Sequence, residues 1–192
     1  MYKKQMTFQR VVSYLLLASC ALVFIYSLGL MTDLYDYVYP NYRNGKPRVT
    51  NGDIYMNMQE FNRTLTVVAI GLILVGLFNF VMGTNSRRKY YIGNYFSIGL
   101  TFVCNIGVSV WSIINILDYR AYYLNIDWDA LKEILDRQQI EMVKSTFWFD
   151  AGFVVFGIFI VVTLLFVANL VMKIMVMKSE RRLIGSRKDV RA

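Results

Sequence analysis

The chain has 192 residues, of which 56% are hydrophobic and 16% aromatic, and its formal net charge is +8. A composition this apolar is unusual for a soluble domain of this length and indicates a membrane protein. The sequence contains no His, the commonest metal ligand and general base, and no CxxC, nucleophile-elbow or phosphate-loop motif. It therefore predicts a non-enzymatic protein without a metal or cofactor site.

The basic residues stand in short segments beside apolar runs. This pattern is typical of residues that set membrane topology, whereas nucleic-acid binding requires a solvated basic face. We therefore expect membrane lipid and other membrane proteins as partners, and no nucleic acid.

The first apolar run covers residues 11–31 and follows Lys3, Lys4 and Arg10. This start resembles a signal peptide, but the run of 21 residues is long enough to cross a bilayer and no A-x-A cleavage site follows it. We predict a retained first helix. Ser13, Cys20 and Ser27 recur every seven positions, which places small side chains on one face.

The next connection, residues 32–63, contains both prolines and two Asn-Gly pairs, so we expect a polar loop with a short hairpin. Acids and tyrosines alternate over residues 33–39. They are interpreted either as an aromatic belt at the membrane surface, which we favour, or as a ligand site.

The second predicted span covers residues 64–83 and carries Ala69, Gly76 and Gly83 at heptad spacing, with Asn79 beside them. A short loop, residues 84–94, follows and contains three adjacent basic residues, Arg87, Arg88 and Lys89. Short loops rich in Lys and Arg stay in the cytoplasm, so this cluster is the strongest indicator of orientation.

The third predicted span, residues 95–117, has a polar face that begins just before it. The face consists of Asn94, Ser97, Thr101, Asn105, Ser109, Ser112 and Asn115, at spacings of three or four. We expect this face to point into the bundle. It either holds helices together, which we favour, or lines a hydrated path.

The second outer connection, residues 118–146, is predicted to contain an amphipathic helix that starts at the N-cap Asp127. Its apolar side is formed by Trp128, Leu131, Leu135 and Met142. Because acids and bases are mixed on the polar side, we favour contact with a partner protein over contact with the lipid surface.

The fourth predicted span covers residues 147–172 and contains one formal charge, Asp150. We expect Asp150 in the first turn of the helix at the outer boundary, facing protein and bonded to Arg120 or Lys144. A proton-relay or ion-binding role is the alternative. Its face continues as a stripe that we expect to pack closely, formed by Val154, Gly157, Val161, Leu164 and Ala168.

The tail, residues 173–192, carries seven of the 21 Lys and Arg residues. The N-terminal segment, the loop 84–94 and the tail together hold 13 basic residues, and the two outer connections hold eight. The positive-inside rule then places both termini in the cytoplasm. The predicted fold class is an all-α integral membrane protein, with one domain of four transmembrane helices and one amphipathic outer helix.

Two functions follow as hypotheses. The first is a non-enzymatic accessory or assembly subunit of a larger, transport-type membrane complex, because small-residue stripes recur and no catalytic set is present. The second is a small oligomeric transporter or channel that uses the polar face 94–115 and Asp150. Short loops and outer connections without Cys fit a bacterial plasma (inner) membrane protein.

Overall fold

The computed structural model describes residues 2–32, 42–43, 46–47, 49–85, 91–133 and 144–189. Four helices are long and apolar enough to cross a membrane. They are α1 (Tyr2–Met31), α2 (Ile54–Asn85), α3 (Tyr91–Leu124) and α6 (Phe147–Asp189). A fifth, short helix, α4 (Trp128–Lys132), precedes α6. The predicted helical bundle with four candidate spans is confirmed.

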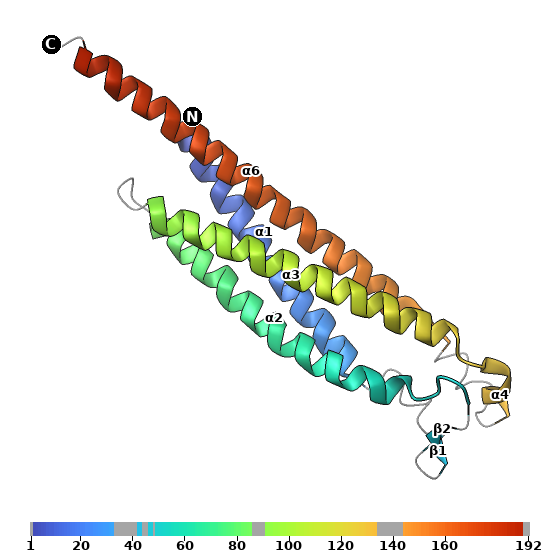
Figure 1. Ribbon diagram of the computed structural model, residues 1–192. Coiled ribbons are helices and arrows are strands. Elements are labelled where there is room, and N and C mark those ends of the chain that lie inside the picture. The colour runs from blue at the N-terminus through green and yellow to red at the C-terminus, as the bar shows by residue number, and fades with distance from the viewer. Residues whose placement is uncertain are drawn as a thin grey trace.

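The four long helices form a ring, in which α1 contacts α2, α2 contacts α3, α3 contacts α6, and α6 contacts α1 (Figure 1). The start of α1 and the end of α6 lie at one end of the bundle, which we call the terminus end. The end of α1, the start of α2, the end of α3 and the start of α6 lie at the other end, which we call the connection end. Figure 1 also shows that α6 extends beyond the other helices towards the C-terminus.

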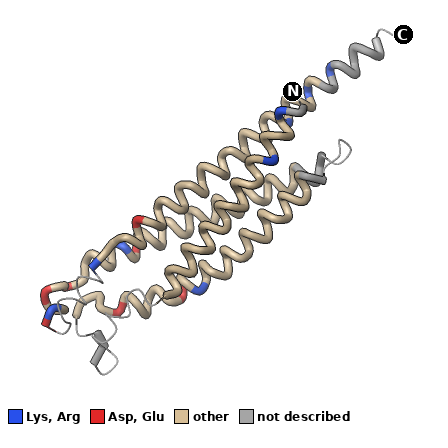
Figure 2. Tube along the Cα trace, turned by 180° about the vertical axis from the view of Figure 1, so that it is seen from behind, with Lys and Arg blue, Asp and Glu red and all other residues tan. Residues whose placement is uncertain are grey.

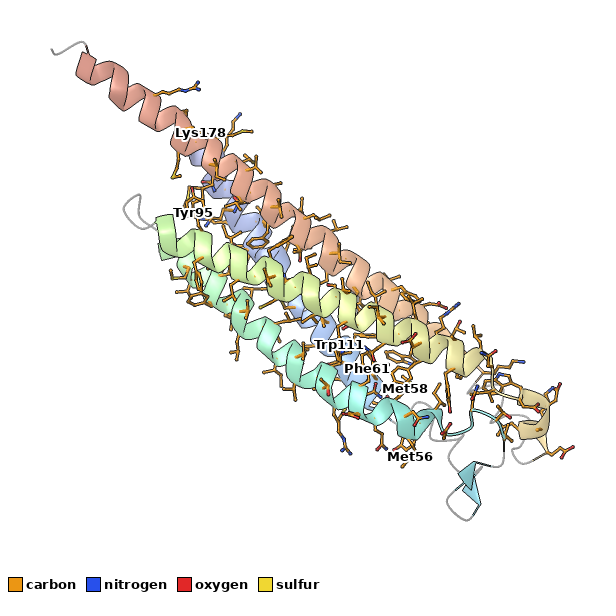
Figure 3. All side chains as sticks on the ribbon, in the orientation of Figure 1. Met56, Met58, Phe61, Tyr95, Trp111 and Lys178 are labelled. Carbon is orange, nitrogen blue, oxygen red and sulfur yellow. The ribbon has the colours of Figure 1, made fainter. Side chains whose placement is uncertain are left out.

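The helices are longer than the predicted spans, so parts of the predicted loops are helical. The largest correction concerns the connection 32–63, where α2 already begins at Ile54. Its first turns bury Ile54, Met58 and Phe61 at spacings of four and three, whereas Met56 is 45% exposed and points away from the bundle (Figure 3). A helical hydrophobic period can thus continue outside the uncharged run.

The same extension occurs in the other helices. Helix α1 begins at Tyr2 rather than near residue 11, and α3 continues to Leu124 rather than ending near 117. Helix α6 runs through most of the predicted tail, to Asp189. Charge limits how deep a segment enters the hydrocarbon, but it does not end a helix whose backbone bonds remain intact.

The first connection contains a two-residue antiparallel pairing between β1 (Tyr42–Arg43) and β2 (Lys46–Pro47), which agrees with the expected short hairpin. The turn before α2 is fastened to the end of α3. The Asn51 amide, on a backbone with φ of 59°, donates to the carbonyl oxygens of Tyr122 and Asn125, both at 3.3 Å. The Tyr122 hydroxyl donates to Asp53.

The small-residue faces predicted on α1 and α2 pack against each other, a pairing that the sequence alone did not assign. Ser13, Cys20 and Ser27 are at most 4% exposed, and Ala69 is fully buried. A Cβ added at Gly76 would lie 3.3 Å from Leu17 and 3.5 Å from the Cys20 sulfur, so these two backbones approach closely.

Helices α1 and α6 also meet closely, at the connection end. The Trp148 indole lies over Gly29, where an added Cβ would be 2.5 Å from the ring. The Tyr26 hydroxyl donates to the Trp148 carbonyl at 3.1 Å and covers Gly152. An added Cβ at Gly152 would also lie 2.8 Å from Ile116 Cδ1. Both glycines therefore provide space for an aromatic side chain of the facing helix.

A pair of substitutions on α6 tests this close approach. Gly152→Ala forces Tyr26 and Ile116 to move and should destabilise the fold by about 1–3 kcal/mol. Gly157→Ala lies on the same helix, where an added Cβ meets nothing within 4 Å, and should be neutral or stabilising by up to ~1 kcal/mol. Thermal unfolding in detergent measures both. Equal unfolding temperatures for the two variants would contradict the packing.

Candidate functional site

The polar face of α3 points into the bundle, as predicted. Five of its seven side chains are at most 1% exposed: Ser97, Thr101, Asn105, Ser109 and Ser112. Asn115 is half-buried, and the side chain of Asn94 lies outside the described part of the structure. The face is buried between protein helices. Its hydrogen-bonding partners therefore show whether its side chains hold helices together or have polar groups that could contact a transported ligand.

Three of these side chains bond to the backbone of their own helix. The Thr101 hydroxyl donates to the Ser97 carbonyl at 2.8 Å, and the Ser109 hydroxyl donates to the Asn105 carbonyl at 2.7 Å. The Asn115 amide donates to the Trp111 carbonyl at 2.8 Å. Bonds to the carbonyl one turn earlier satisfy a buried hydroxyl without a ligand.

Asn105 connects α3 to α6 near the middle of the bundle. Its amide donates to the Thr163 hydroxyl at 3.0 Å, and that hydroxyl donates to the Phe159 carbonyl at 2.8 Å. Both side chains are at most 1% exposed. Such bonds contribute about 0.6 kcal/mol each between membrane helices. The geometry therefore favours helix association as the role of Asn105.

A second group of buried polar residues lies at the terminus end, and only two of its members, Asn79 and Ser97, were predicted. We call it the polar layer, and it consists of Gln5, Gln9, Asn79, Ser97, Asn169 and Lys173, each at most 4% exposed. The four helices all contribute to it. One feature of the sequence could have indicated this group. The polar residues of α6 share one helical face with two aromatic residues, in the series Phe159, Thr163, Phe166, Asn169 and Lys173.

Hydrogen bonds join the polar layer across the helices. The Gln5 amide donates to the side-chain oxygens of Gln9 and Asn169, both at 3.0 Å. The Gln9 amide donates to the Gly83 carbonyl at 3.2 Å. On the other side of the bundle, the Ser97 hydroxyl donates to the Asn79 side-chain oxygen at 3.4 Å. Bonds thus link α1 to α2 and α6, and α2 to α3.

Asp150 lies in the first turn of α6 at the connection end, as expected. Its carboxylate accepts a hydrogen bond from the Thr146 hydroxyl at 2.7 Å and pairs with the Arg120 guanidinium at 3.4 Å. The predicted partner Arg120 is confirmed. The two side chains are 37% and 54% exposed, for Arg120 and Asp150 respectively. A pair this exposed contributes only about 0–1 kcal/mol to stability.

The face of α6 below Asp150 differs from the prediction. Val154, Val161 and Leu164 are each more than half exposed, and Gly157 has no neighbour within 4 Å of an added Cβ. The buried face instead carries the aromatic residues Phe149, Phe156, Phe159 and Phe166. Large rings fill the space between helices and make more dispersion contacts than small side chains do. Asp150 therefore faces Arg120, but its helix face is on the outside of the chain.

The predicted outer docking face is described only in part. Asp127 caps α4 by accepting from the Ala130 backbone at 3.0 Å, but Leu135 and Met142 lie outside the described residues, as do Arg87, Arg88 and Lys89. Leu131 is fully buried in the chain's own core, and the Trp128 ring packs on Tyr123 with centroids 5.2 Å apart. Leu131 is therefore used in the chain's own core, whereas Trp128 is only partly buried.

The polar side of α4 is exposed. The Lys132 ammonium donates to the Asp129 carboxylate at 2.5 Å, and this bond lowers the pKa of Asp129. Among the residues that the structure describes, no three His, Cys, Asp or Glu side chains come together as a metal site requires.

Comparison of the chain with protein-family models, with curated proteins and with solved structures gives no match. The function is therefore argued from the residues themselves.

A double-mutant cycle tests the role of Asn105. Asn105→Leu and Thr163→Val each remove the bond between α3 and α6, so their destabilisations should not add. We expect a coupling free energy of ~0.6 kcal/mol, and at most about 1.7 kcal/mol, from reversible unfolding in detergent. The pair Asn115→Leu and Thr163→Val serves as control, because Asn115 bonds to its own helix. Additive effects for Asn105 and Thr163 would contradict the proposed link.

Proposed function

We propose that this protein is a non-enzymatic accessory or assembly subunit of a larger membrane complex, in the bacterial inner membrane. Four membrane crossings place both termini on one side, and the positive-inside rule makes that side the cytoplasm.

The distribution of charge supports this orientation. In Figure 2, the described acidic residues lie towards the connection end, whereas basic residues lie at both ends. The acids at the connection end include Asp53, Glu60, Asp118, Asp127, Asp129, Glu133 and Asp150. Lys4, Arg10 and Lys178 lie at the terminus end, where anionic lipid of the cytoplasmic leaflet would attract them.

The observation that carries the proposal is a set of helix glycines with nothing beside them. An added Cβ would meet no atom within 4 Å at Gly71, Gly99, Gly107 or Gly157. Glycine in a helix costs about 0.5–1 kcal/mol relative to Ala, and no close contact in this chain offsets that cost. Small residues on membrane helices allow another helix to approach closely. These positions on α2, α3 and α6 are therefore suited to contact with further membrane helices.

The interior of the bundle supports the same role. Four side chains of the α3 polar face bond to backbone carbonyls or to Thr163, namely those of Thr101, Asn105, Ser109 and Asn115. On this interpretation, the polar face of α3 holds the four helices of the subunit together. The outer faces of the helices are then available for association with other membrane helices.

Replacement of the open glycines tests this proposal. Gly99→Leu and Gly107→Leu on α3, or Gly157→Leu on α6, should block close approach and reduce association at least roughly tenfold, since 1.4 kcal/mol of lost contact has that effect. The unfolding temperature should not fall, because an added Cβ at these positions meets no atom within 4 Å. Val110→Leu, at an exposed position of α3, is the matched control.

The measurement is the mass of the detergent-solubilised species at native expression level. A partner protein adds its own mass, and self-association gives multiples of 22.4 kDa. A wild-type species with the mass of one chain would contradict the proposal.

A second candidate function is transport, and the specific observation behind it is the length of the buried polar series. Polar residues continue from Gln5 and Lys173 at the terminus end, through Thr101 and Asn105, to Ser112 towards the connection end. The Ser112 hydroxyl has no hydrogen-bond partner among the described residues. Such a series could carry ions or protons if water entered it.

Flux into liposomes separates the two functions. We expect K⁺, Na⁺ and proton flux at background for the wild type, Asn105→Leu and Asp150→Asn, because the α3 hydrogen bonds are closed within the bundle. Protein-free liposomes set the background. Wild-type flux above background that either substitution reduces would favour transport over the accessory role.

A further inference from the structure

The first turns of α1 carry polar side chains on the surface that faces away from the bundle. Lys4 and Arg10 are exposed, and Tyr14 is 61% exposed. Arg10 and Tyr14 stand four positions apart, so they are neighbours on one face of the helix. Val11 and Leu15, which follow them in the chain, are 49% and 42% exposed. Arg10 and Tyr14 therefore belong to an outer face of α1 that also presents apolar side chains to lipid.

The depth of these two side chains follows from the length of the uncharged run. Residues 11–31 carry no charge, and about 20 residues of helix cross ~30 Å of hydrocarbon. Arg10 therefore stands at the boundary of the hydrocarbon. Tyr14 lies one turn deeper, but helical side chains lean towards the N-terminus of their helix, so its hydroxyl extends towards the level of Arg10. Both polar groups are thus presented near the depth of the lipid phosphates.

Contacts inside the protein hold this part of α1 in place. The Gln9 amide donates to the Gly83 carbonyl of α2 at 3.2 Å, and the Ser13 hydroxyl donates to the Gln9 carbonyl at 2.8 Å. The Tyr14 ring packs on the Phe80 ring of α2, with centroids 5.3 Å apart. The outer face around Arg10 is therefore carried by a helix that is already ordered, which reduces the entropy lost when a ligand binds.

The two helices do not supply negative charge at this place. Helix α1 contains no Asp or Glu, and α2 contains none after Glu60, which lies towards the connection end. A charged side chain at the edge of the hydrocarbon is costly unless it is hydrated or paired. The exposed guanidinium of Arg10 is therefore suited to an anionic group that comes from the membrane itself.

We propose that Arg10 and Tyr14 bind the phosphate group of an anionic phospholipid, with phosphatidylglycerol as the form to test. The planar guanidinium donates two parallel hydrogen bonds to phosphate oxygens, and the Tyr14 hydroxyl donates a third. Lys4, nearer the start of the helix, favours a headgroup of net negative charge over a zwitterionic one. The acyl chains lie along the apolar side chains of the same face. This inference does not depend on whether the protein acts as an accessory subunit.

Lipid titration of the full chain tests the site. The chain is purified in a neutral detergent, and its thermal unfolding is followed while phosphatidylglycerol is added at constant detergent and salt. We expect the unfolding temperature to rise by at least about 3 °C and to saturate. Phosphatidylcholine at the same concentrations should give a clearly smaller rise. Native mass spectrometry should detect one retained phosphatidylglycerol molecule per chain.

Four variants resolve the contribution of each group, each compared with its own lipid-free unfolding temperature. Arg10→Gln should weaken the apparent affinity for phosphatidylglycerol at least roughly tenfold, because it removes charged hydrogen bonds. Arg10→Lys keeps the charge without the planar fork and should lie between Arg10→Gln and the wild type. Tyr14→Phe keeps the ring contact with Phe80 and should weaken binding by a smaller factor. Lys178→Gln, at an exposed basic position of α6 (Figure 3), is the matched control and should leave the affinity unchanged.

Four results would overturn the inference. One is an equal response of the wild type to phosphatidylglycerol and to phosphatidylcholine. Another is an unchanged affinity in Arg10→Gln. The third is an equal loss of affinity in Lys178→Gln and Arg10→Gln, which would indicate general attraction of surface charge. The fourth is equal stabilisation by inorganic phosphate, which would assign the site to a free anion in place of a lipid.

Discussion

The structure depends on one constraint, which is that polar groups buried between membrane helices must find partners within the protein. Hydrocarbon offers no hydrogen bonds, so backbone groups are satisfied inside helices. Lipid tails are as apolar as Leu, so the hydrophobic effect does not hold one helix to another. Close packing and hydrogen bonds between helices do so instead. In this chain they are provided by glycines under aromatic rings, such as Gly29 under Trp148, and by bonds such as that between Asn105 and Thr163.

Close packing and interhelical hydrogen bonds occur at different positions along the bundle. At the connection end, α1 and α6 meet through Gly29, Gly152 and two aromatic side chains, Tyr26 and Trp148. At the middle, one amide links α3 to α6. At the terminus end, the polar layer joins α1 to α2 and α6 through amide groups. Most of the described charged side chains lie towards the two ends of the bundle (Figure 2).

The balance of functional hypotheses follows from how these polar groups are used. A transport path requires groups that can exchange partners with a passing ion, whereas the Thr101 and Ser109 hydroxyls are bonded to carbonyls of their own helix. The open glycines, in contrast, make no contact within the described chain. The free-energy cost of placing glycine in a helix is offset only when another helix packs against it. For this reason an accessory role explains the interior and the outer faces together. A transport role explains only the interior.

The sequence by itself determined the number of long apolar helices and the inward direction of the α3 polar face, because both depend on periodicity within one segment. It also indicated Arg120 as one of the candidate partners of Asp150, with Lys144 as the other basic residue, because both stand beside the ends of predicted spans. Only the tertiary structure decided which face of α6 is buried, because aromatic and small-residue faces are both plausible packing surfaces. Tertiary structure also brought Gln5 to Asn169, 164 residues apart. The pattern within one helix carries no information about which residue of another helix it will meet.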